Sequence, residues 1–298
     1  NRIVSSGKLS EFFGVWGKGF YGGKYVQKFE NDCEKFFKVK HAIAVNSWTS
    51  GLICSVGALD ISPGDEIIVP TWTMSACATS ILVWNAVPVF ADINYETYNL
   101  DPKDVEKKIT KRTKAIMAVD IFGHSAPIKE LKIIAKKYKL KIISDSAQSP
   151  GARYGNKYAG TLCDIGGISL NYHKHINTGE GGVIFTNSKF YADRMRLIRN
   201  HAESVVANKK VNSLQNLIGF NFRMGEIEAA IGIMQLKKLK RIIKNKQMIA
   251  KILYKGLGKL NGIKLQKTKK NCSHVYYVFP MQIEMEKIGV HRNKIYQA

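Results

Sequence analysis

The segment GISLNYHKHINTGEGG, residues 167–182, joins a short apolar run to a lysine and then to a glycine-rich turn. Its first residues, Gly167–Leu170, are predicted to form a buried strand, and Lys174 follows shortly after that strand. Upstream, the apolar run Lys141–Ser144 ends directly before Asp145. Short apolar or β-branched runs of this kind are typical of buried parallel strands. The segment therefore predicts a sheet with a lysine after one strand and an acid after another.

The same alternation of strand-like and helix-like patterns extends from residue 40 to residue 187. Further strands are predicted at Ala42–Val45, Glu66–Val69, Pro88–Asp92, Lys114–Val119 and Val183–Thr186. Helices are predicted to begin near Ser50, to run from Asp101-Pro102 to about Ile109, and to cover Ile128–Tyr138. Strands that alternate with helices in this way predict an α/β fold, here a doubly wound, three-layer domain with a mostly parallel sheet.

The pattern changes after Arg223, where the sequence predicts one long helix, Glu226–Leu257, with apolar residues at helical spacing and lysines on the other face. The final residues, 262–298, contain one clear predicted strand, Val275–Met281. We therefore expect two domains, a large one over residues 1–235 and a smaller α+β domain over residues 236–298. The small domain is expected to be incomplete at its C-terminal end.

The formal net charge of +23 would suit a polyanionic partner such as nucleic acid. The lysines are nevertheless spread over the whole chain, most densely between residues 236 and 270, without the interleaved aromatic residues of RNA-binding segments. A solvated lysine-rich surface explains this distribution better, so we expect no nucleic-acid partner. A basic nucleic-acid-binding or regulatory protein is kept as the alternative, and a basic groove for a phosphorylated small molecule would also fit.

The five cysteines have no paired spacing, and their odd number argues against a disulfide framework. The first residues lack the apolar core of a signal peptide, and no run approaches the roughly 18 apolar residues of a membrane span. These features predict a soluble, cytoplasmic protein that does not bind a membrane.

Polar residues that follow the predicted strands are the candidate site residues, because ligands of open α/β sheets bind beyond the carboxyl ends of the strands. Asp145 could pair with a protonated pyridine nitrogen, although an ordinary helix N-cap explains an aspartate at this position equally well. Lys174 changes that balance, since a lysine held at a strand end among small residues can lose its proton and form a Schiff base with an aldehyde. Together the two residues predict a site for pyridoxal 5′-phosphate (PLP).

Two further features would suit the phosphate of such a cofactor. The Ser169 hydroxyl lies on the strand before the lysine, and Asn46–Ser50 follows a strand and opens a helix whose N-terminus could bind an anion. Simple helix capping is the alternative for Thr49. His173 and His175 flank the lysine without a third ligand at metal spacing, so we expect them to line the pocket rather than to bind a metal.

These residues resemble those of the DegT/DnrJ/EryC1/StrS group of PLP-dependent nucleotide-sugar aminotransferases, which have the aspartate aminotransferase fold (fold type I). The similarity is carried by Gly22–Glu30, His41–Leu59, Asp145–Gln148, Ser169–Gly182, Gly219–Met224 and Gln235-Leu236. The resemblance implies a three-layer large domain of the PLP-transferase type, followed by a small domain that in family members usually continues well past this length.

By position, the resemblance implies that Lys174 forms the Schiff base with PLP, that Asp145 binds its ring nitrogen, and that Gln148 lies near its ring hydroxyl. It also implies three anchors for the phosphate. These anchors are the Trp48-Thr49 turn, Ser169, and Asn221 from a second subunit. The resemblance therefore implies a homodimer with shared active sites.

Two positions depart from the pattern of the family. Trp48 stands where glycine or alanine is usual, and Met74 stands where an aromatic residue often stacks on the cofactor ring. Trp72 lies two residues before Met74 and would share its face if this segment were a strand. Either of these two side chains is therefore a candidate for the stacking.

The reaction implied by the resemblance is amino transfer from glutamate or glutamine, through PLP, to a keto-sugar nucleotide. A sister branch of the family has histidine in place of the lysine and removes water from the sugar instead. Lys174 favours the aminotransferase. A dehydratase of the same family, or an aminotransferase that acts on another substrate, is the nearer alternative.

Overall fold

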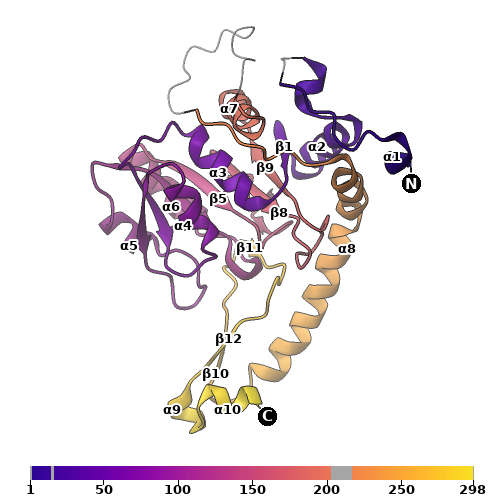
Figure 1. The fold of residues 1–298 in the computed structure, drawn as a ribbon. Helices are drawn as coiled ribbons and strands as arrows, with labels where there is room; N and C mark the ends of the chain where they lie inside the picture. The colour runs from indigo at the N-terminus through magenta and orange to yellow at the C-terminus, as the bar shows by residue number, and fades with distance from the viewer. Residues whose placement is uncertain (1, 15–16, 203–216, 298) are drawn as a thin grey trace.

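The computed structural model describes residues 2–14, 17–202 and 217–297. Its centre is a seven-stranded sheet with the order β1-β9-β8-β5-β4-β2-β3 (Figure 1). The strands are β1 (His41–Val45), β2 (Glu66–Pro70), β3 (Val87–Ala91), β4 (Thr113–Val119), β5 (Lys141–Asp145), β8 (Ile165–Ser169) and β9 (Gly182–Thr186). From β8 to β3 each strand pairs in parallel with its neighbour, and β9 alone pairs antiparallel, with both β1 and β8.

The prediction of a mostly parallel sheet is confirmed, but the prediction that Val183–Thr186 is one of its parallel strands is wrong. Residues 170–181 join β8 to β9 and contain no helix. A strand that pairs with the strand before it can run parallel only after a crossover connection, which is usually a helix. Without such a crossover, β9 turns back and pairs antiparallel.

Helices cover both faces of the sheet and complete the three layers of the fold (Figure 1). One face carries α3 (Trp48–Ala58), α4 (Ala76–Leu82) and α7 (Lys189–Arg199). The other face carries α2 (Lys24–Phe37), α5 (Pro102–Lys107), α6 (Ile128–Tyr138) and the beginning of α8 (Glu226–Leu257). Short helices described outside these layers are α1 (Arg2–Ser6), η1 (Lys18–Tyr21) and η2 (Ile121–Gly123).

Each face of the sheet has its own hydrophobic core, and successive side chains of a strand belong alternately to one core and the other. In β1, Ile43 and Val45 belong to the core under α3, whereas Ala42 and Ala44 belong to the core under α2 and α8. Because both faces of the sheet are covered, the strands are apolar on both sides. This property is why the strands are recognisable from the sequence as continuous apolar runs.

The helices Ile128–Tyr138 and Glu226–Leu257 form with the predicted bounds, as α6 and α8. The helix predicted to reach about Ile109 ends at Lys107, with Lys108 as its C-cap. Helices α2 (Lys24–Phe37), α4 (Ala76–Leu82) and α7 (Lys189–Arg199) were not predicted from the sequence. The signal for α2 was present, since its buried residues recur at helical spacing: Val26, Phe29, Glu30, Cys33 and Phe37.

Helix α8 leaves the core after its first half and leads to the C-terminal segment (Figure 1). Its buried residues are concentrated between Glu226 and Leu239, with only Ala250 buried beyond them. The predicted boundary at residues 235/236 therefore lies inside one continuous helix, and the division into two domains stays a prediction. In the described part of the chain, no helix is both long and apolar enough to cross a membrane.

The C-terminal segment forms two small sheets rather than the single predicted strand. The elements of both sheets and the helices that follow them are β6 (Arg153–Tyr154), β7 (Lys157–Tyr158), β10 (Ile263–Leu265), β11 (Cys272–Ser273), β12 (Met281–Ile283), α9 (Met285–Ile288) and α10 (Arg292–Gln297). In one of these sheets a C-terminal strand, β11, pairs with β6, which pairs in turn with β7. The prediction of a strand over Val275–Met281 is wrong, because only its last residue lies in a strand. Val275 is instead buried, and its N–H donates to the carbonyl of Gly123. Val275 is therefore held by burial and by this loop hydrogen bond rather than by strand pairing.

Candidate functional site

The carboxyl ends of β5 and β8 lie at one edge of the sheet, next to the start of α3. Asp145 at the end of β5 is paired with Gly167 of β8, and Ser169 at the end of β8 is paired with Gly182 of β9. Gly182 is in turn paired with Val45, the last residue of β1 before α3. Strand pairing, parallel between β5 and β8 and antiparallel on both sides of β9, thus brings together residues that are far apart in the sequence.

The Asp145 carboxylate is 4% exposed and accepts hydrogen bonds on both oxygens. Oδ1 accepts from the indole N–H of Trp48 at 2.6 Å and from the backbone N–H of Ala147 at 3.0 Å. Oδ2 accepts from the Cys77 thiol at 3.1 Å. No helix begins after Asp145, so the alternative that this residue is a helix N-cap is wrong.

Cys77, on α4, is a residue of the site that the sequence analysis missed. Burial, and then the neighbouring Asp145 carboxylate, hold the pKa of the Cys77 thiol well above its ordinary value. The thiol therefore keeps its proton and serves as a donor. No local pattern could have indicated this contact, because the two residues lie 68 positions apart.

Lys174 lies in the turn after β8 and is partly buried. Burial lowers the pKa of its ammonium group, and the Asp145 carboxylate opposes that shift. Its Nζ lies 4.2 Å from the centroid of the Tyr277 ring, in the C-terminal segment. Tyr277, which sequence reasoning also missed, therefore forms part of the surroundings of the lysine.

The start of α3 has the properties of an anion site. Ser47 is the N-cap and accepts from the N–H of Ser50 at 3.1 Å, so capping is the role of Ser47 rather than of Thr49. Trp48 and Thr49 lie in the first turn, where helix N–H groups have no acceptor within the helix. A Cβ on Gly182 would lie 2.8 Å from the Trp48 nitrogen, so glycine at this position permits the close approach of β9 to α3.

The remaining residues singled out by sequence lie around this edge. Gln148 Oε1 accepts from the N–H of Phe122 at 2.7 Å, and Ser169 Oγ accepts from the N–H of Asn171 at 3.2 Å. The exposed Asn221 binds Arg223 through its side chain at 2.8 Å, and its carbonyl lies 3.4 Å from Nδ2 of Asn46, just before α3.

Trp72 and Met74 lie between β2 and α4 in a segment without strand structure. The strand alternation that would have placed both on one face therefore does not apply. They are 59% and 67% exposed, and Trp72 lines a hollow of about 860 Å³ that also includes Tyr98 and Phe122. That Trp72 or Met74 stacks on the cofactor ring stays a prediction.

His175 is buried, and its Nε2 lies 2.7 Å from the carbonyl oxygen of Val275, which ties the C-terminal segment to the turn after β8. That His173 and His175 line the pocket stays a prediction. Burial lowers the pKa of the His175 imidazole to about 4. His173 is exposed, and over the described ranges no group of three histidine, cysteine, aspartate or glutamate side chains is arranged to hold a metal ion.

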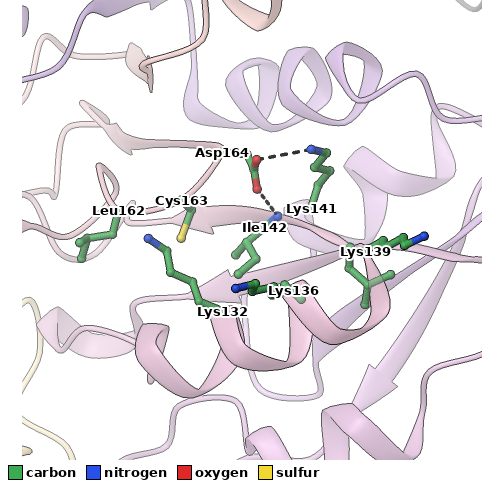
Figure 2. A pocket seen from close by; sticks show the side chains of 10 residues that line it. Lys132, Lys136, Lys139, Lys141, Ile142, Leu162, Cys163 and Asp164 are labelled. Atoms are coloured by element: carbon green, nitrogen blue, oxygen red, sulfur yellow. Dashed lines mark hydrogen bonds and ion pairs between the residues drawn. The ribbon is translucent and has the colours of Figure 1, made fainter.

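A hollow of about 610 Å³ lies at the opposite edge of the sheet, beside the start of β5 (Figure 2). Four lysines surround it: Lys132, Lys136, Lys139 and Lys141. Lys141 lies 3.8 Å from the Asp164 carboxylate. All four lysines are exposed. Lys132 and Lys136 lie on α6, Lys139 is the C-cap of that helix, and Lys141 begins β5, so the hollow is separate from the site around Asp145 at the other end of that strand.

Comparisons with known proteins identify the family and the fold of the chain. The sequence profile of the DegT/DnrJ/EryC1/StrS aminotransferase family matches residues 15–298. GDP-perosamine synthase of Vibrio cholerae is 36% identical over 271 residues, which are 91% of this chain and 72% of that protein. The crystal structure of DesV of S. venezuelae has a TM-score of 0.87 at 28% identity, over 99% of this chain and 74% of that chain.

A second solved structure is a GDP-4-keto-6-deoxymannose-3-dehydratase with a trapped PLP-glutamate geminal diamine. It has a TM-score of 0.87 at 27% identity and covers 99% of this chain and 78% of that chain. The predicted fold and PLP as the cofactor are thereby confirmed. The profile extends over nearly the whole chain, and the chain belongs to the DegT/DnrJ/EryC1/StrS aminotransferase family.

Proposed function

We propose that this protein moves an amino group from glutamate or glutamine to a keto-sugar nucleotide, with PLP as its cofactor. The observation that carries the proposal is the position of Lys174, partly buried and with a lowered pKa, at the same edge of the sheet as the buried Asp145. A lysine with a lowered pKa is more often uncharged and can then react with an aldehyde. Histidine at this position would favour dehydration instead.

The groups at this edge fit PLP. A carboxylate has about four lone pairs, and three of those on Asp145 are taken by Trp48, Ala147 and Cys77. One lone pair on Oδ2 is left for a ring nitrogen. The first turn of α3 and the Ser169 hydroxyl supply donors of the kind that bind phosphate.

The proposal gives each group one task. PLP supplies an electron sink when it is bound. The Asp145 carboxylate holds the charge of the ring nitrogen, and Gln148 lies near the ring hydroxyl. Lys174 holds the cofactor and then moves a proton at the substrate carbon, a general acid/base task typically worth about 10²–10⁴ in rate. Its lowered pKa increases the fraction of uncharged amine, which is the form that accepts the proton.

We expect Lys174→Ala to abolish amino transfer and the visible absorbance of the bound cofactor. Lys132→Ala is the matched control, because Lys132 is exposed beside the lysine-lined hollow at the opposite edge of the sheet (Figure 2). The measurements are an absorbance spectrum before and after glutamate, and turnover of GDP-, dTDP- and UDP-linked keto sugars. Normal turnover by Lys174→Ala would overturn the assignment.

The products separate aminotransferase from dehydratase. Amino transfer replaces a keto oxygen by an amine, whereas dehydration removes water and leaves no nitrogen on the sugar. Mass spectrometry of the sugar product distinguishes the two. A deoxy sugar without nitrogen would make the dehydratase the better assignment, and salt-sensitive retention on DNA without a visible chromophore would favour the basic nucleic-acid-binding alternative.

The proposal includes a cytoplasmic homodimer in which Asn221 of the second copy reaches the phosphate. Two observations support it. The Asn221 side chain is exposed, and the five cysteines are free thiols, as expected in a reducing compartment. A monomeric mass for the active protein in light scattering would contradict the shared site.

A further inference from the structure

We infer that Trp48 is a positioning residue of the cofactor site, in addition to any role of its backbone in phosphate binding. Its indole N–H fixes the Asp145 carboxylate, so that a single lone pair of Oδ2 is left for the ring nitrogen of PLP. The inference rests on the proposed function, because it assigns Asp145 to that nitrogen. It concerns a side chain that stands where the family usually has glycine or alanine.

The geometry of the contact is that of a strong hydrogen bond. The indole nitrogen lies 2.6 Å from Oδ1, and the two side chains are 5% and 4% exposed. Indole N–H is only a donor, so the direction of the bond is unambiguous. Hydrogen bonds to a carboxylate are shorter and stronger than neutral ones, and exclusion of water strengthens them further.

Two glycines provide the space for the indole ring. A Cβ on Gly51, one turn further along α3, would lie 2.6 Å from Cε3 of Trp48. A Cβ on Gly167 of β8 would lie 2.2 Å from Cζ3. The ring is therefore held between α3 and the sheet, in the core cluster that includes Leu52 and Ile143. With the ring held in this way, its N–H stays directed at Asp145.

The carboxylate is consequently held at both oxygens. Trp48 and Ala147 bind Oδ1, and Cys77 binds Oδ2. Loss of the indole N–H would leave Oδ1 with the Ala147 amide alone, inside a dry core. The carboxylate would then be held by two hydrogen bonds instead of three, and its orientation would be less fixed. A less fixed carboxylate pairs more weakly with a protonated ring nitrogen.

The test uses the apoprotein titrated with PLP, with the dissociation constant measured from quenching of tryptophan fluorescence and checked by equilibrium dialysis. Trp48→Phe keeps most of the ring and removes the N–H. We expect it to weaken PLP binding roughly ten- to hundredfold, the usual range for a buried hydrogen bond to a charged group.

Trp84→Phe is the matched control. Trp84 is 4% exposed, lies in the same core cluster, packs against Gly57 of α3, and donates its indole N–H to the carbonyl of Ile53 at 2.9 Å. This substitution removes a comparable ring and a comparable hydrogen bond away from Asp145. We expect a similar loss of stability in urea and a dissociation constant within about twofold of the wild type. Equal weakening of PLP binding by both substitutions would overturn the inference.

A shape-preserving variant separates the hydrogen bond from packing. Benzothienylalanine, incorporated at position 48 alone, keeps the shape of indole with sulfur in place of the N–H. We expect it to weaken PLP binding as Trp48→Phe does, and wild-type affinity would overturn the inference even if the phenylalanine variant failed to fold.

A double mutant tests whether Trp48 affects PLP binding through its hydrogen bond to Asp145. In an Asp145→Asn background, Trp48→Phe is expected to change PLP affinity by less than about twofold, because the charge it positions is already gone. A full additional loss would show a separate role and contradict the inference. Failure of the wild-type apoprotein to bind PLP would instead contradict the proposed function, so the two failures are distinguishable.

Discussion

At the scale of single residues, the site depends on glycines that leave space for a neighbouring ring. The Trp48 indole occupies space that a methyl group on Gly51 would fill, since that Cβ would lie 2.6 Å from the ring. Gly51 also lies in the middle of α3, where glycine is a poor helix former. Glycine at this position therefore weakens the helix propensity of α3 but leaves room for the indole ring.

The effect of Gly51→Ala on the free energy of unfolding should therefore change sign when Trp48 is replaced by alanine. In the wild type we expect it to destabilise the protein by about 1–3 kcal/mol through overpacking. In a Trp48→Ala background the clash is absent, and the same change should stabilise by up to about 1 kcal/mol through helix propensity. Urea unfolding measures both values, with Gly256→Ala in α8, where the new methyl group meets nothing, as the control. Equal destabilisation in both backgrounds would be inconsistent with this account.

At the scale of elements, a buried ion pair joins α7 to α2 and β1. Arg199 Nη1 lies 2.6 Å from the Glu30 carboxylate and 2.9 Å from the carbonyl of Ala44. The same Glu30 oxygen accepts from the N–H of Ala44 at 2.8 Å. Burial lowers the pKa of the Arg199 guanidinium, and the Glu30 carboxylate opposes that shift. Each charge is tolerated in the core only because the other is present.

Removal of either Arg199 or Glu30 alone should therefore lower the stability of the protein strongly. We expect Arg199→Ala to destabilise the protein by about 3–5 kcal/mol, because it leaves the Glu30 carboxylate buried without its counter-charge. Lys28→Ala is the matched control, since the Lys28–Asp32 pair lies on the surface of α2 at 3.0 Å and should contribute less than about 1 kcal/mol. Chemical denaturation monitored by circular dichroism compares the two, and similar losses would refute the argument.

At the scale of the whole molecule, three buried histidines lie where the C-terminal segment, residues 262–297, contacts the rest of the chain. His124 accepts from the N–H of Lys269, His175 binds the carbonyl of Val275, and His274 bonds to Gln266. Burial lowers the pKa of these imidazoles to about 4, 4 and 3, respectively. All three therefore remain neutral in the folded protein at pH values where an unfolded histidine, with a pKa near 6.5, takes up a proton.

The sign of the pH dependence follows from these shifts. Their contribution to stability is complete above about pH 6.5 and is lost as the pH falls from 6.5 toward 4, because the unfolded chain binds more protons there. The buried Asp120 acts in the opposite direction, since burial raises its pKa to about 6 and its protonation favours the folded state in acid. With three imidazoles against one carboxyl, we expect the melting temperature to fall between pH 7 and pH 5.

His175→Gln tests this dependence. Glutamine can still donate to the carbonyl of Val275 but does not titrate, so the decline in melting temperature from pH 7 to pH 5 should become shallower. An unchanged decline would show that another group controls the acid sensitivity. His173→Gln, at an exposed position in the same turn, is the control and should leave the decline as in the wild type.

Part of the candidate site was accessible from the sequence because strand ends are local features. Asp145 and Ser169 each end an apolar run, and the structure brings these two strand ends to one edge of the sheet. Trp48 was also singled out, but for its backbone, since nothing in the sequence indicates where its indole N–H points. Its acceptor lies 97 residues away.

The sequence alone determined the positions of the sheet strands, the helices α6 and α8, and the lysine after β8. These features follow from hydrophobic periodicity and from residue types at strand ends, which are properties of short segments. The tertiary structure alone decided that β9 runs antiparallel, that Cys77 and Trp48 hold Asp145, and that Tyr277 lies over Lys174. Those outcomes depend on long-range packing between strands and helices, for which no local pattern carries a signal.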